Sequence, residues 1–357
     1  MRMNRSRVPG LTLVLFFAVS LFLPLPSLFA FDARTPPGAR NVILISWDGV
    51  QREHLRELLE TKKLPNLARL SANGGLVDID VVGHQTDTKA GHTQMLTGRE
   101  PETTGVYSNS RFMPIPEGLS IFEYLQGQFG RDRVATVMLT GKSHHIGSMG
   151  PVEARGARNK ALSLLKEPKG GQKREQLKKF ISNLLSKLKN RRAATASANG
   201  EPWYLIRDNL TVWDGDLQRD ASQVGPLALE YLQRFSAQRL FAFFHFSDPD
   251  HAGHGHGENS PEYSDAIVTC DAWLGKILAK LETLGIADRT IVFVTSDHGF
   301  DEGKTSHKDA PFVFLATNDP KVTYSGLQRD IVPTILMEMG VDPLKVAPPL
   351  PGRSLAR

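Results

Sequence analysis

Four short apolar runs, each rich in β-branched or aromatic residues, alternate along the chain with stretches of helical spacing. The runs are NVILISW, RVATVMLT, LFAFFHF and TIVFVTS, at residues 41–47, 133–140, 240–246 and 290–296. A further run, APFVFLAT at 310–317, is expected to be another strand. Continuously apolar strands that alternate with helices are typical of a mostly parallel sheet covered on both faces. We therefore predict an α/β fold, a three-layer α/β/α sandwich.

The helices are expected where apolar residues recur at three- and four-residue intervals. They fall at residues 51–60, 120–129, 226–235, 271–284 and 326–340. The single cysteine, Cys270, lies in an amphipathic pattern, so we expect a buried thiol and no intrachain disulfide.

The N-terminus has the features of a secretory signal peptide. Three arginines precede an apolar stretch that Pro24 interrupts, and Ala30 offers a small residue for cleavage. We expect residues 1–30 to be a signal peptide and the protein to be exported, to a periplasm or the cell exterior. An uncleaved N-terminal membrane anchor is the alternative. Residues 31–357 are expected to form a single catalytic domain.

Residues 151–222 depart from the alternating pattern, and we predict that they form a helical basic insertion, or cap, within this domain. Between residues 153 and 193 there are 13 Lys and Arg against 3 Glu, whereas the rest of the chain after the signal is net acidic. Leucines and an isoleucine at helical spacing over 177–188 indicate an amphipathic helix. Its positive face could contact a membrane or simply be solvated. Since the positive charge is confined to this segment, we expect no specific nucleic-acid recognition.

Acidic residues follow three of the expected strands. Asp48 comes after the first, Asp248 and Asp250 after the run at 240–246, and Asp297 after the run at 290–296. In open α/β sheets the carboxyl ends of the strands form the ligand crevice. Carboxylates from distant parts of the chain are therefore expected to meet at one edge.

Histidines accompany these acids. His254 lies four residues after Asp250, His298 follows Asp297 directly, and His307 precedes the run at 310–317. Mixed carboxylate and imidazole ligands suit Zn²⁺ and, less selectively, Mn²⁺ or Fe. The pattern predicts a metal site, with Zn²⁺ favoured.

In these motifs the chain resembles the alkaline phosphatase superfamily and, within it, the type I phosphodiesterase/nucleotide pyrophosphatase family. The resemblance rests on SWDG at 46–49, TKAGH at 88–92, TGREP at 97–101, DPDHAGH at 248–254 and SDHG at 296–299, in that order, and on the late His307. It implies an alkaline phosphatase-like sandwich and a hydrolase of phosphoric esters. Its substrate would be a small-molecule phosphate ester or a nucleotide.

The resemblance also implies roles for individual residues. The ligands of one metal would be Asp48, Thr88, Asp297 and His298, and those of the other Asp250, His254 and His307. Thr88, and not Thr86, would be the nucleophile, and it would pass through a phosphothreonine intermediate. A threonine hydroxyl is too weak an acid to ionise unaided at neutral pH, but a bound cation and a helix N-terminus both favour its anion.

Two further residues bear on the substrate. Asn109 falls where the family has an asparagine that contacts a phosphate oxygen, although a turn asparagine is the alternative. Lys142, in LTGKSHH, lies where some relatives carry a lysine that binds a phosphoryl dianion; the alternative is an exposed loop lysine. KAG at 89–91 replaces the aromatic-Pro-Asn that usually follows the nucleophile, which puts the usual nucleotide-base slot in doubt.

We therefore expect a phosphodiesterase or nucleotide pyrophosphatase, with a phosphomonoesterase as the alternative. A sulfatase is a weaker alternative, because formylglycine is made from Cys or Ser and Thr88 cannot supply it. A phosphotransferase or mutase would have to keep water from the phosphoenzyme. A non-catalytic binding protein would be expected to show gaps among the seven ligand positions.

Overall fold

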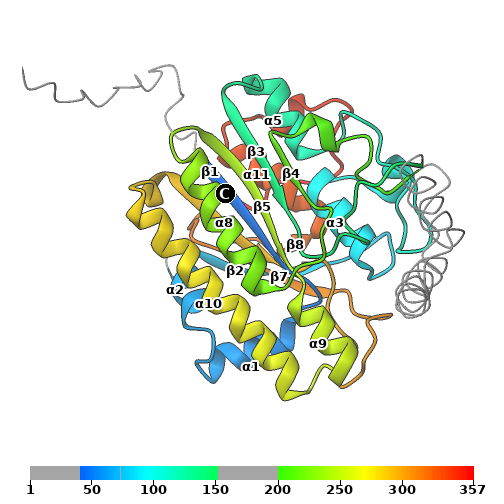
Figure 1. Cartoon of the computed structure of the whole chain (residues 1–357), viewed down its shortest axis with the longest axis vertical. Coiled ribbons are helices and arrows are strands. Elements are labelled where there is room, and N and C mark those ends of the chain that lie inside the picture. Colours follow the sequence, from blue (N-terminus) through cyan, green and yellow to red (C-terminus); the bar gives the residue numbers. More distant parts are fainter. Residues whose placement is uncertain (1–40, 73, 152–199) are drawn as a thin grey trace, which may run out of the picture. The chain divides into compact units, whose positions relative to one another are not determined.

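An eight-stranded sheet forms the centre of the computed structural model, which describes residues 41–72, 74–151 and 200–357 (Figure 1). Its strand order is β4-β3-β5-β1-β6-β7-β2-β8. The strands span β1 Asn41–Trp47, β2 Gly75–Asp80, β3 Val134–Leu139, β4 Val212–Asp214, β5 Arg239–Phe246, β6 Thr290–Thr295, β7 Phe312–Thr317 and β8 Gly326–Leu327.

Five neighbouring strands, from β4 to β6, run parallel. In the middle, β1 lies between β5 and β6, and Leu44 is paired with Phe243 on one side and with Phe293 on the other. Only β7 interrupts the direction, because it is antiparallel to both β6 and β2. The prediction of a mostly parallel α/β sheet is confirmed.

Helices cover both faces of this sheet. They are α1 Arg52–Glu60, α2 Pro65–Ala72, α3 Thr88–Thr97, α4 Pro101–Thr104, α5 Ile121–Phe129, α8 Ala221–Phe235, α9 Asp248–His256, α10 Pro261–Thr283 and α11 Ile331–Glu338. On one face α1, α2, α8 and α10 share an apolar core with Ile43 and Ile45. On the other, α3, α5 and α11 share a core with Val42 and Leu44.

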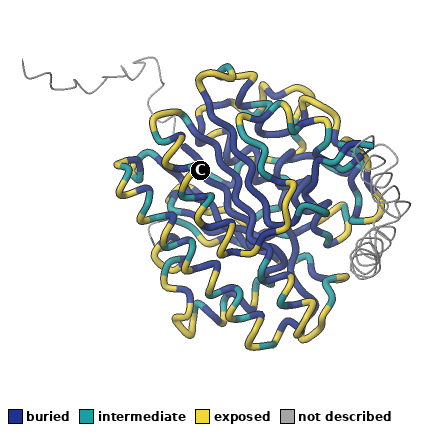
Figure 2. Tube along the Cα trace, in the orientation of Figure 1, coloured by how far each residue is buried: buried dark blue, intermediate teal, exposed yellow. Residues whose placement is uncertain are grey.

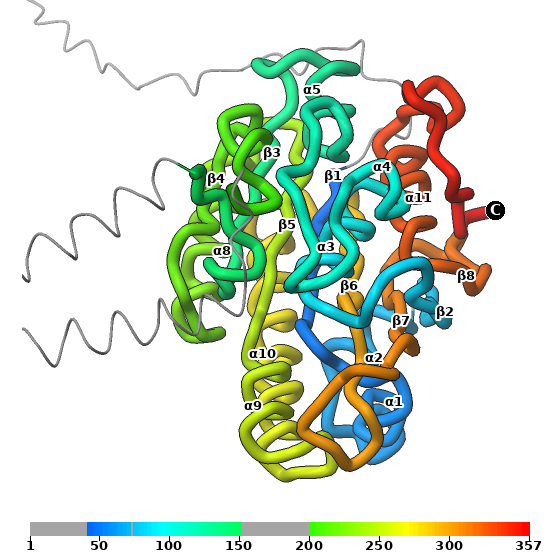
Figure 3. Tube along the Cα trace, turned by 90° about the vertical axis from the view of Figure 1, so that its right-hand side faces the viewer, coloured from blue at the N-terminus to red at the C-terminus, as the bar shows by residue number. Residues whose placement is uncertain are grey.

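Successive side chains of β1 therefore pack into two separate cores, one on each face of the sheet, as a three-layer sandwich requires. Figure 3 shows the strands between the two helix layers, and Figure 2 shows that the strands of the centre are buried throughout. Cys270 is buried in α10, as expected.

All five expected strands are present, as β1, β3, β5, β6 and β7. Three short or alternating strands, β2, β4 and β8, were not expected. The expected helix at 226–235 begins earlier, at Ala221, so that Pro226 lies inside α8 rather than at its start.

The signal peptide at 1–30 and the basic helix at 177–188 lie outside the described residues. Of the expected insertion at 151–222, the structure describes Pro151 and the part from residue 200 on. That part includes β4, which pairs with β3 as an edge strand of the main sheet. Among the described residues, none of the helices has both the length and the apolar character that a membrane span needs.

Candidate metal and catalytic site

Three aspartates meet at the carboxyl ends of neighbouring strands. Asp48 follows β1 directly, Asp250 lies in the first turn of α9, after β5, and Asp297 lies two residues beyond β6. Their side chains are 0%, 3% and 0% exposed, respectively. Burying carboxylates is costly unless cations or hydrogen-bond donors surround them. The convergence predicted from the strand ends is confirmed.

Each aspartate uses one oxygen in the protein and leaves the other unbonded. Gly49 N–H donates to Asp297 Oδ1 at 3.1 Å. Lys142 Nζ lies 2.9 Å from Asp48 Oδ2 and 2.5 Å from Asp250 Oδ2. Asp48 Oδ1, Asp250 Oδ1 and Asp297 Oδ2 are buried without a hydrogen-bond partner in the part of the chain that the structure describes. Such orphaned anionic oxygens are what a bound cation would satisfy.

Three histidines present their Nε2 atoms to the same place. His254, His298 and His307 each place Nδ1 at 2.6–2.9 Å from a backbone carbonyl oxygen. The carbonyls are those of Thr305, Gly299 and Thr86, respectively. A carbonyl can only accept, so Nδ1 carries the hydrogen, and in the neutral ring Nε2 keeps its lone pair for a metal.

The ligands divide into two groups. In what we call the outer group, Asp250, His254 and His307, the Nε2 atoms of the two histidines lie 3.4 and 3.8 Å from Asp250 Oδ1. In the inner group, Asp48, Asp297 and His298, the histidine Nε2 lies 3.6 Å from Asp48 Oδ1 and 3.3 Å from Asp297 Oδ2.

Asp250 Oδ1 also lies 3.9 Å from His298 Nε2, so the two groups adjoin. The ligand atoms of the outer group lie within 4.8 Å of one another, as do those of Asp48, Asp250 and His298. Carboxylate and imidazole donors in this number fit two borderline divalent cations. The residues present therefore fit bound divalent metal.

Thr88 lies where a nucleophile is needed. It is the first residue of α3, and it is buried with 1% of its surface exposed. Its Oγ1 lies 3.3 Å from Lys142 Nζ and 3.4 Å from His298 Nε2. The hydroxyl therefore faces the inner group, and it sits beside an ammonium that favours a negative charge on oxygen.

Thr86 has a different role. Its hydroxyl donates to the carbonyl of His307, and its own carbonyl accepts from His307 Nδ1 at 2.6 Å. These two contacts fix the backbone and the ring of an outer ligand, which leaves Thr88 as the hydroxyl that faces the site.

Asn109 braces the start of α3. Its side-chain Oδ1 accepts from the backbone N–H of Lys89 at 2.9 Å, and its backbone N–H donates to Asp87 Oδ2 at 2.8 Å. Because the carbonyl oxygen is used, the Nδ2 group is the part of this amide left for a ligand. The residue thus lies beside the nucleophile, on the N-terminal side of the helix.

Lys142 is buried with 1% of its surface exposed, and it lies just beyond β3. The alternative of an exposed loop lysine is wrong, because the Lys142 ammonium bridges Asp48 and Asp250 and reaches Thr88. Burial alone would lower the pKa of Lys142, but the carboxylates of Asp250 and Asp48 outweigh it and raise the pKa. Burial likewise opposes ionisation of Asp48, yet Lys142 and His245 hold its pKa well below the usual range.

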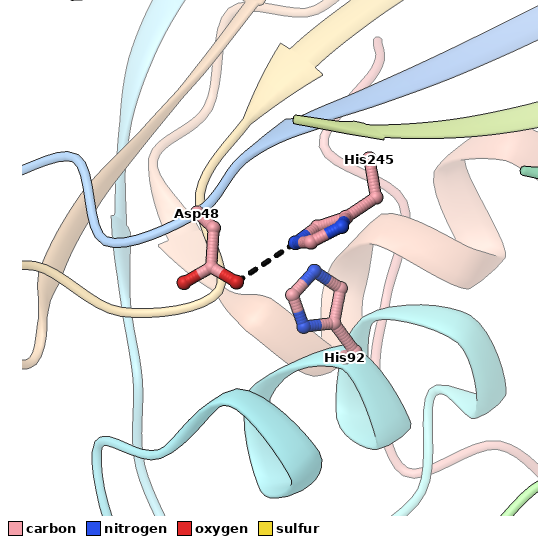
Figure 4. Close-up of side chains that lie close together, drawn as sticks. All are labelled: Asp48, His92 and His245. Atoms are coloured by element: carbon pink, nitrogen blue, oxygen red, sulfur yellow. Dashed lines mark hydrogen bonds and ion pairs between the residues drawn. The ribbon is translucent and has the colours of Figure 1, made fainter. Parts of the chain in front are cut away.

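Two buried histidines beside Asp48 were not among the predicted site residues (Figure 4). His245 in β5 places Nε2 2.7 Å from Asp48 Oδ2, and burial lowers its pKa to about 4. His92 in α3 donates from Nδ1 to the Thr88 carbonyl at 2.8 Å, and its Nε2 lies 2.9 Å from Ser46 Oγ. A histidine within the apolar run LFAFFHF was the signal that could have revealed the first.

Asp48, His92 and His245 are close enough together to hold an ion, but their nitrogens are already used. His92 Nδ1 bonds to a carbonyl, so Nε2 accepts from the Ser46 hydroxyl. His245 Nδ1 accepts from Gly141 N–H at 3.1 Å, so Nε2 carries the hydrogen. Neither imidazole has a nitrogen lone pair left over, so these three residues are not a third metal site. Within the trio, His245 supports Asp48.

A model of one protein family matches most of the chain. The family is described as type I phosphodiesterase / nucleotide pyrophosphatase, and the match covers residues 42–323. The chain belongs to this family. All the ligand positions of the inner and outer groups, as well as Thr88, Asn109 and Lys142, fall within the matched residues.

Relatives of this phosphodiesterase family member span several chemistries. The chain is 34% identical over 105 residues to a steryl-sulfatase of Rattus norvegicus. The aligned region covers 27% of the chain and 17% of the relative. It is 31% identical over 107 residues to ectonucleotide pyrophosphatase/phosphodiesterase family member 1 of Mus musculus, over 28% of the chain and 11% of the relative. These curated relatives are thus matched over less than a fifth of their own length.

Among solved structures, the chain is similar to the phosphonate monoester hydrolase of Silicibacter pomeroyi, with a TM-score of 0.52 at 17% identity. The superposition covers 88% of this chain and 76% of the hydrolase. At this identity the likeness concerns the fold, and it agrees with an alkaline phosphatase-like sandwich. The family match and the likeness in fold therefore agree with each other.

Proposed function

We propose that this protein is an exported, two-metal phosphoric ester hydrolase that acts through a phosphothreonine at Thr88. The observation that carries the proposal is the position of Thr88 Oγ1, 3.4 Å from His298 Nε2 and 3.3 Å from Lys142 Nζ. Around it, three buried aspartate oxygens lack hydrogen-bond partners among the described residues. Export rests on the sequence of residues 1–30.

The reaction would proceed in two displacements. Thr88 Oγ attacks phosphorus, its proton is lost, and the alcohol or nucleotide of the substrate leaves. Water then attacks the phosphorus of the phosphothreonine, which restores the threonine and releases the phosphate product. When bound, two divalent ions, with Zn²⁺ favoured over Mn²⁺ or Fe, would stabilise the negative charge on the attacking and leaving oxygens.

The protein's own groups would prepare these steps. Lys142 keeps a positive charge beside the nucleophile. The N-terminus of α3 adds the partial positive charge of its free amides. Asn109 is placed to hold a non-bridging phosphate oxygen through Nδ2, because its Oδ1 is already bound to Lys89 N.

We favour a diester or a nucleotide as the substrate. The Lys142 ammonium has three hydrogens, and it has three neighbours, Asp48, Asp250 and Thr88. An ammonium that already pairs with two carboxylates gains less binding free energy from the second negative charge of a phosphate monoester than an unpaired ammonium would. The phosphomonoesterase alternative keeps support from the 3.3 Å contact between Lys142 and Thr88, which would place the same ammonium next to a bound dianion.

A sulfatase reaction is the remaining enzymatic alternative, since sulfatases are among the relatives. The only cysteine, Cys270, is buried in α10, and Thr88 has no thiol or primary alcohol from which formylglycine could be made. Membrane contact through the basic residues 153–193 is a further proposal, which a vesicle-binding assay would test.

The test is kcat/KM of the zinc-loaded mature protein on bis-p-nitrophenyl phosphate, p-nitrophenyl phosphate and p-nitrophenyl sulfate, measured side by side. The proposal expects the diester to be the best of the three. Monoester preference would establish the phosphomonoesterase alternative. Sulfate preference, or no turnover of any ester by metal-bound protein, would contradict the proposal.

A further inference from the structure

We propose that His245 is a positioning residue that holds the Asp48 carboxylate with Oδ1 facing the inner ion and ties this ligand to the loop that carries Lys142. The inference rests on the proposed metal site, because it concerns how one ligand of that site is oriented. It assigns a role to a residue that the pattern of acids and histidines did not reveal.

The position of His245 is unusual for a polar side chain. It lies in β5, next to Phe244 and Phe246, and its side chain is 0% exposed. An imidazole in such surroundings costs free energy unless both ring nitrogens have partners. Both ring nitrogens of His245 have a partner. One partner, Asp48, follows β1, and the other, Gly141, follows β3.

The contacts fix which nitrogen carries the hydrogen. Gly141 N–H can only donate, so Nδ1, 3.1 Å away, must be the acceptor. The neutral ring then has its hydrogen on Nε2, which donates to Asp48 Oδ2 at 2.7 Å. The direction of both hydrogen bonds thus follows from one backbone amide.

The hydrogen bond sets the orientation of Asp48. Its Oδ2 lies 2.7 Å from His245 Nε2 and 2.9 Å from Lys142 Nζ, so both contacts use the same oxygen. Oδ1 is left without a partner among the described residues, and it lies 3.6 Å from His298 Nε2. Rotating the carboxylate away from the inner group would break the buried hydrogen bond from His245 and the ion pair with Lys142.

The second contact reaches the neighbouring loop. Since β5 pairs with β1 on one side and with β3 on the other, His245 stands between Asp48 and Gly141. Lys142, the residue after Gly141, turns its ammonium back to Asp48. His245, Asp48, Lys142 and Gly141 therefore close a ring of contacts in which one imidazole sets both the ligand and the cation beside it.

Two substitutions separate the two contacts. His245→Gln retains an N–H donor at the distance of Nε2 and removes the acceptor for Gly141. His245→Asn retains an oxygen acceptor at the distance of Nδ1 and removes the donor to Asp48. The matched control is His256→Asn, which replaces an exposed histidine of α9 outside both ligand groups.

The measurement is the affinity of each metal-free protein for Zn²⁺, by competition calorimetry. We expect His245→Asn to weaken binding of the inner ion by about 10- to 100-fold, the usual cost of losing a hydrogen bond to a ligand. His245→Gln and His256→Asn should stay within about threefold of the wild-type affinity, because the Asp48 contact survives in both. Equal losses in the Asn and Gln variants, or no loss in either, would overturn the proposal.

A measurement on the wild-type protein keeps the test independent of folding of the variants. In the metal-free protein, ¹⁵N NMR should show the His245 ring as the neutral Nε2–H form, assigned by through-bond correlation of the ring to the His245 backbone. A ring with hydrogen on Nδ1 would overturn the proposal. Failure of the wild-type protein to bind any divalent ion would instead contradict the proposed function, so the two failures are distinguishable.

Discussion

The inner and outer ligand groups have similar chemistry but differ in exposure. In the inner group Asp48, Asp297 and His298 are each 0% exposed, whereas in the outer group Asp250, His307 and His254 are 3%, 12% and 46% exposed. The inner ligands stand at the ends of the central strands β1 and β6. The outer ones stand on α9 and on the loop before β7.

Under the proposed function, this difference would separate two tasks within one site. The inner group adjoins Thr88 and is held by buried hydrogen bonds, so it is suited to activating the nucleophile in one fixed geometry. The outer group is exposed at His254, and in the proposed mechanism the leaving group and the second-step water would approach from there.

The largest effect is expected for the nucleophile. Thr88→Ala removes the attacking oxygen, so kcat/KM on the diester should fall by at least about a thousandfold. Steady-state kinetics on the zinc-loaded protein would measure it. Thr93→Ala, a buried threonine of the same helix whose hydroxyl donates to the Lys89 carbonyl, is the control and should retain most activity. Near wild-type turnover by Thr88→Ala would place the nucleophile elsewhere.

Removing one ligand from each group should distinguish the two ions. Asp297→Asn and His254→Ala should each lower bound metal from two ions to one and reduce kcat/KM by about 100-fold or more. The remaining ion should exchange slowly in His254→Ala, where the buried inner group is intact, and rapidly in Asp297→Asn. Metal analysis during dialysis against a chelator would measure both. Slow exchange in Asp297→Asn would contradict the division into buried and open groups.

Lys142 is expected to affect substrates unequally. Lys142→Met keeps the length of the side chain but removes the charge beside Thr88, and kcat/KM on p-nitrophenyl phosphate should fall by about 100-fold. The loss on bis-p-nitrophenyl phosphate should be smaller, because a diester carries one negative charge fewer. Equal losses on the two esters would show that Lys142 acts on Asp48, Asp250 and Thr88 and does not bind the second phosphate charge.

The smallest effect concerns pH. Burial would lower the pKa of His298, but the carboxylates of Asp297 and Asp48 outweigh it and raise the pKa. The pKa of His307 is lowered, by burial and by the nearby His298. A proton on Nε2 blocks coordination, so protons compete for the inner histidine at a higher pH than for the outer one. Between about pH 8 and pH 5, the usual range for histidine, zinc affinity of the inner group should decline first. Calorimetry on Asp297→Asn and His254→Ala would separate the groups, and earlier loss of the outer ion would contradict this ordering.

Much of this site followed from where acids stand relative to apolar runs. Asp48, Asp250 and Asp297 could be placed together because buried parallel strands end at one edge of a sheet. The choice of Thr88 over Thr86 required the resemblance to a known family, and the structure gives a physical reason for it: the Thr86 backbone and hydroxyl are bound to His307.

What the sequence did not show depends on which strands become neighbours. His245 reads as one more residue of an apolar strand until β5 is known to lie beside both β1 and β3. The burial of Lys142 depends on the same neighbours, since its carboxylate partners are 94 and 108 residues away in sequence. The strands β4 and β8, with three and two residues, are too short to give a recognisable pattern.

The most direct test of the account is to trap the covalent intermediate. Zinc-loaded protein would be mixed rapidly with bis-p-nitrophenyl phosphate, quenched in acid, digested and analysed by peptide mass spectrometry. The account predicts a phosphoryl adduct on Thr88 in the wild-type protein and in Thr93→Ala, and none in Thr88→Ala. An adduct on another residue, or full turnover by the wild-type protein with no adduct at any time after mixing, would contradict it.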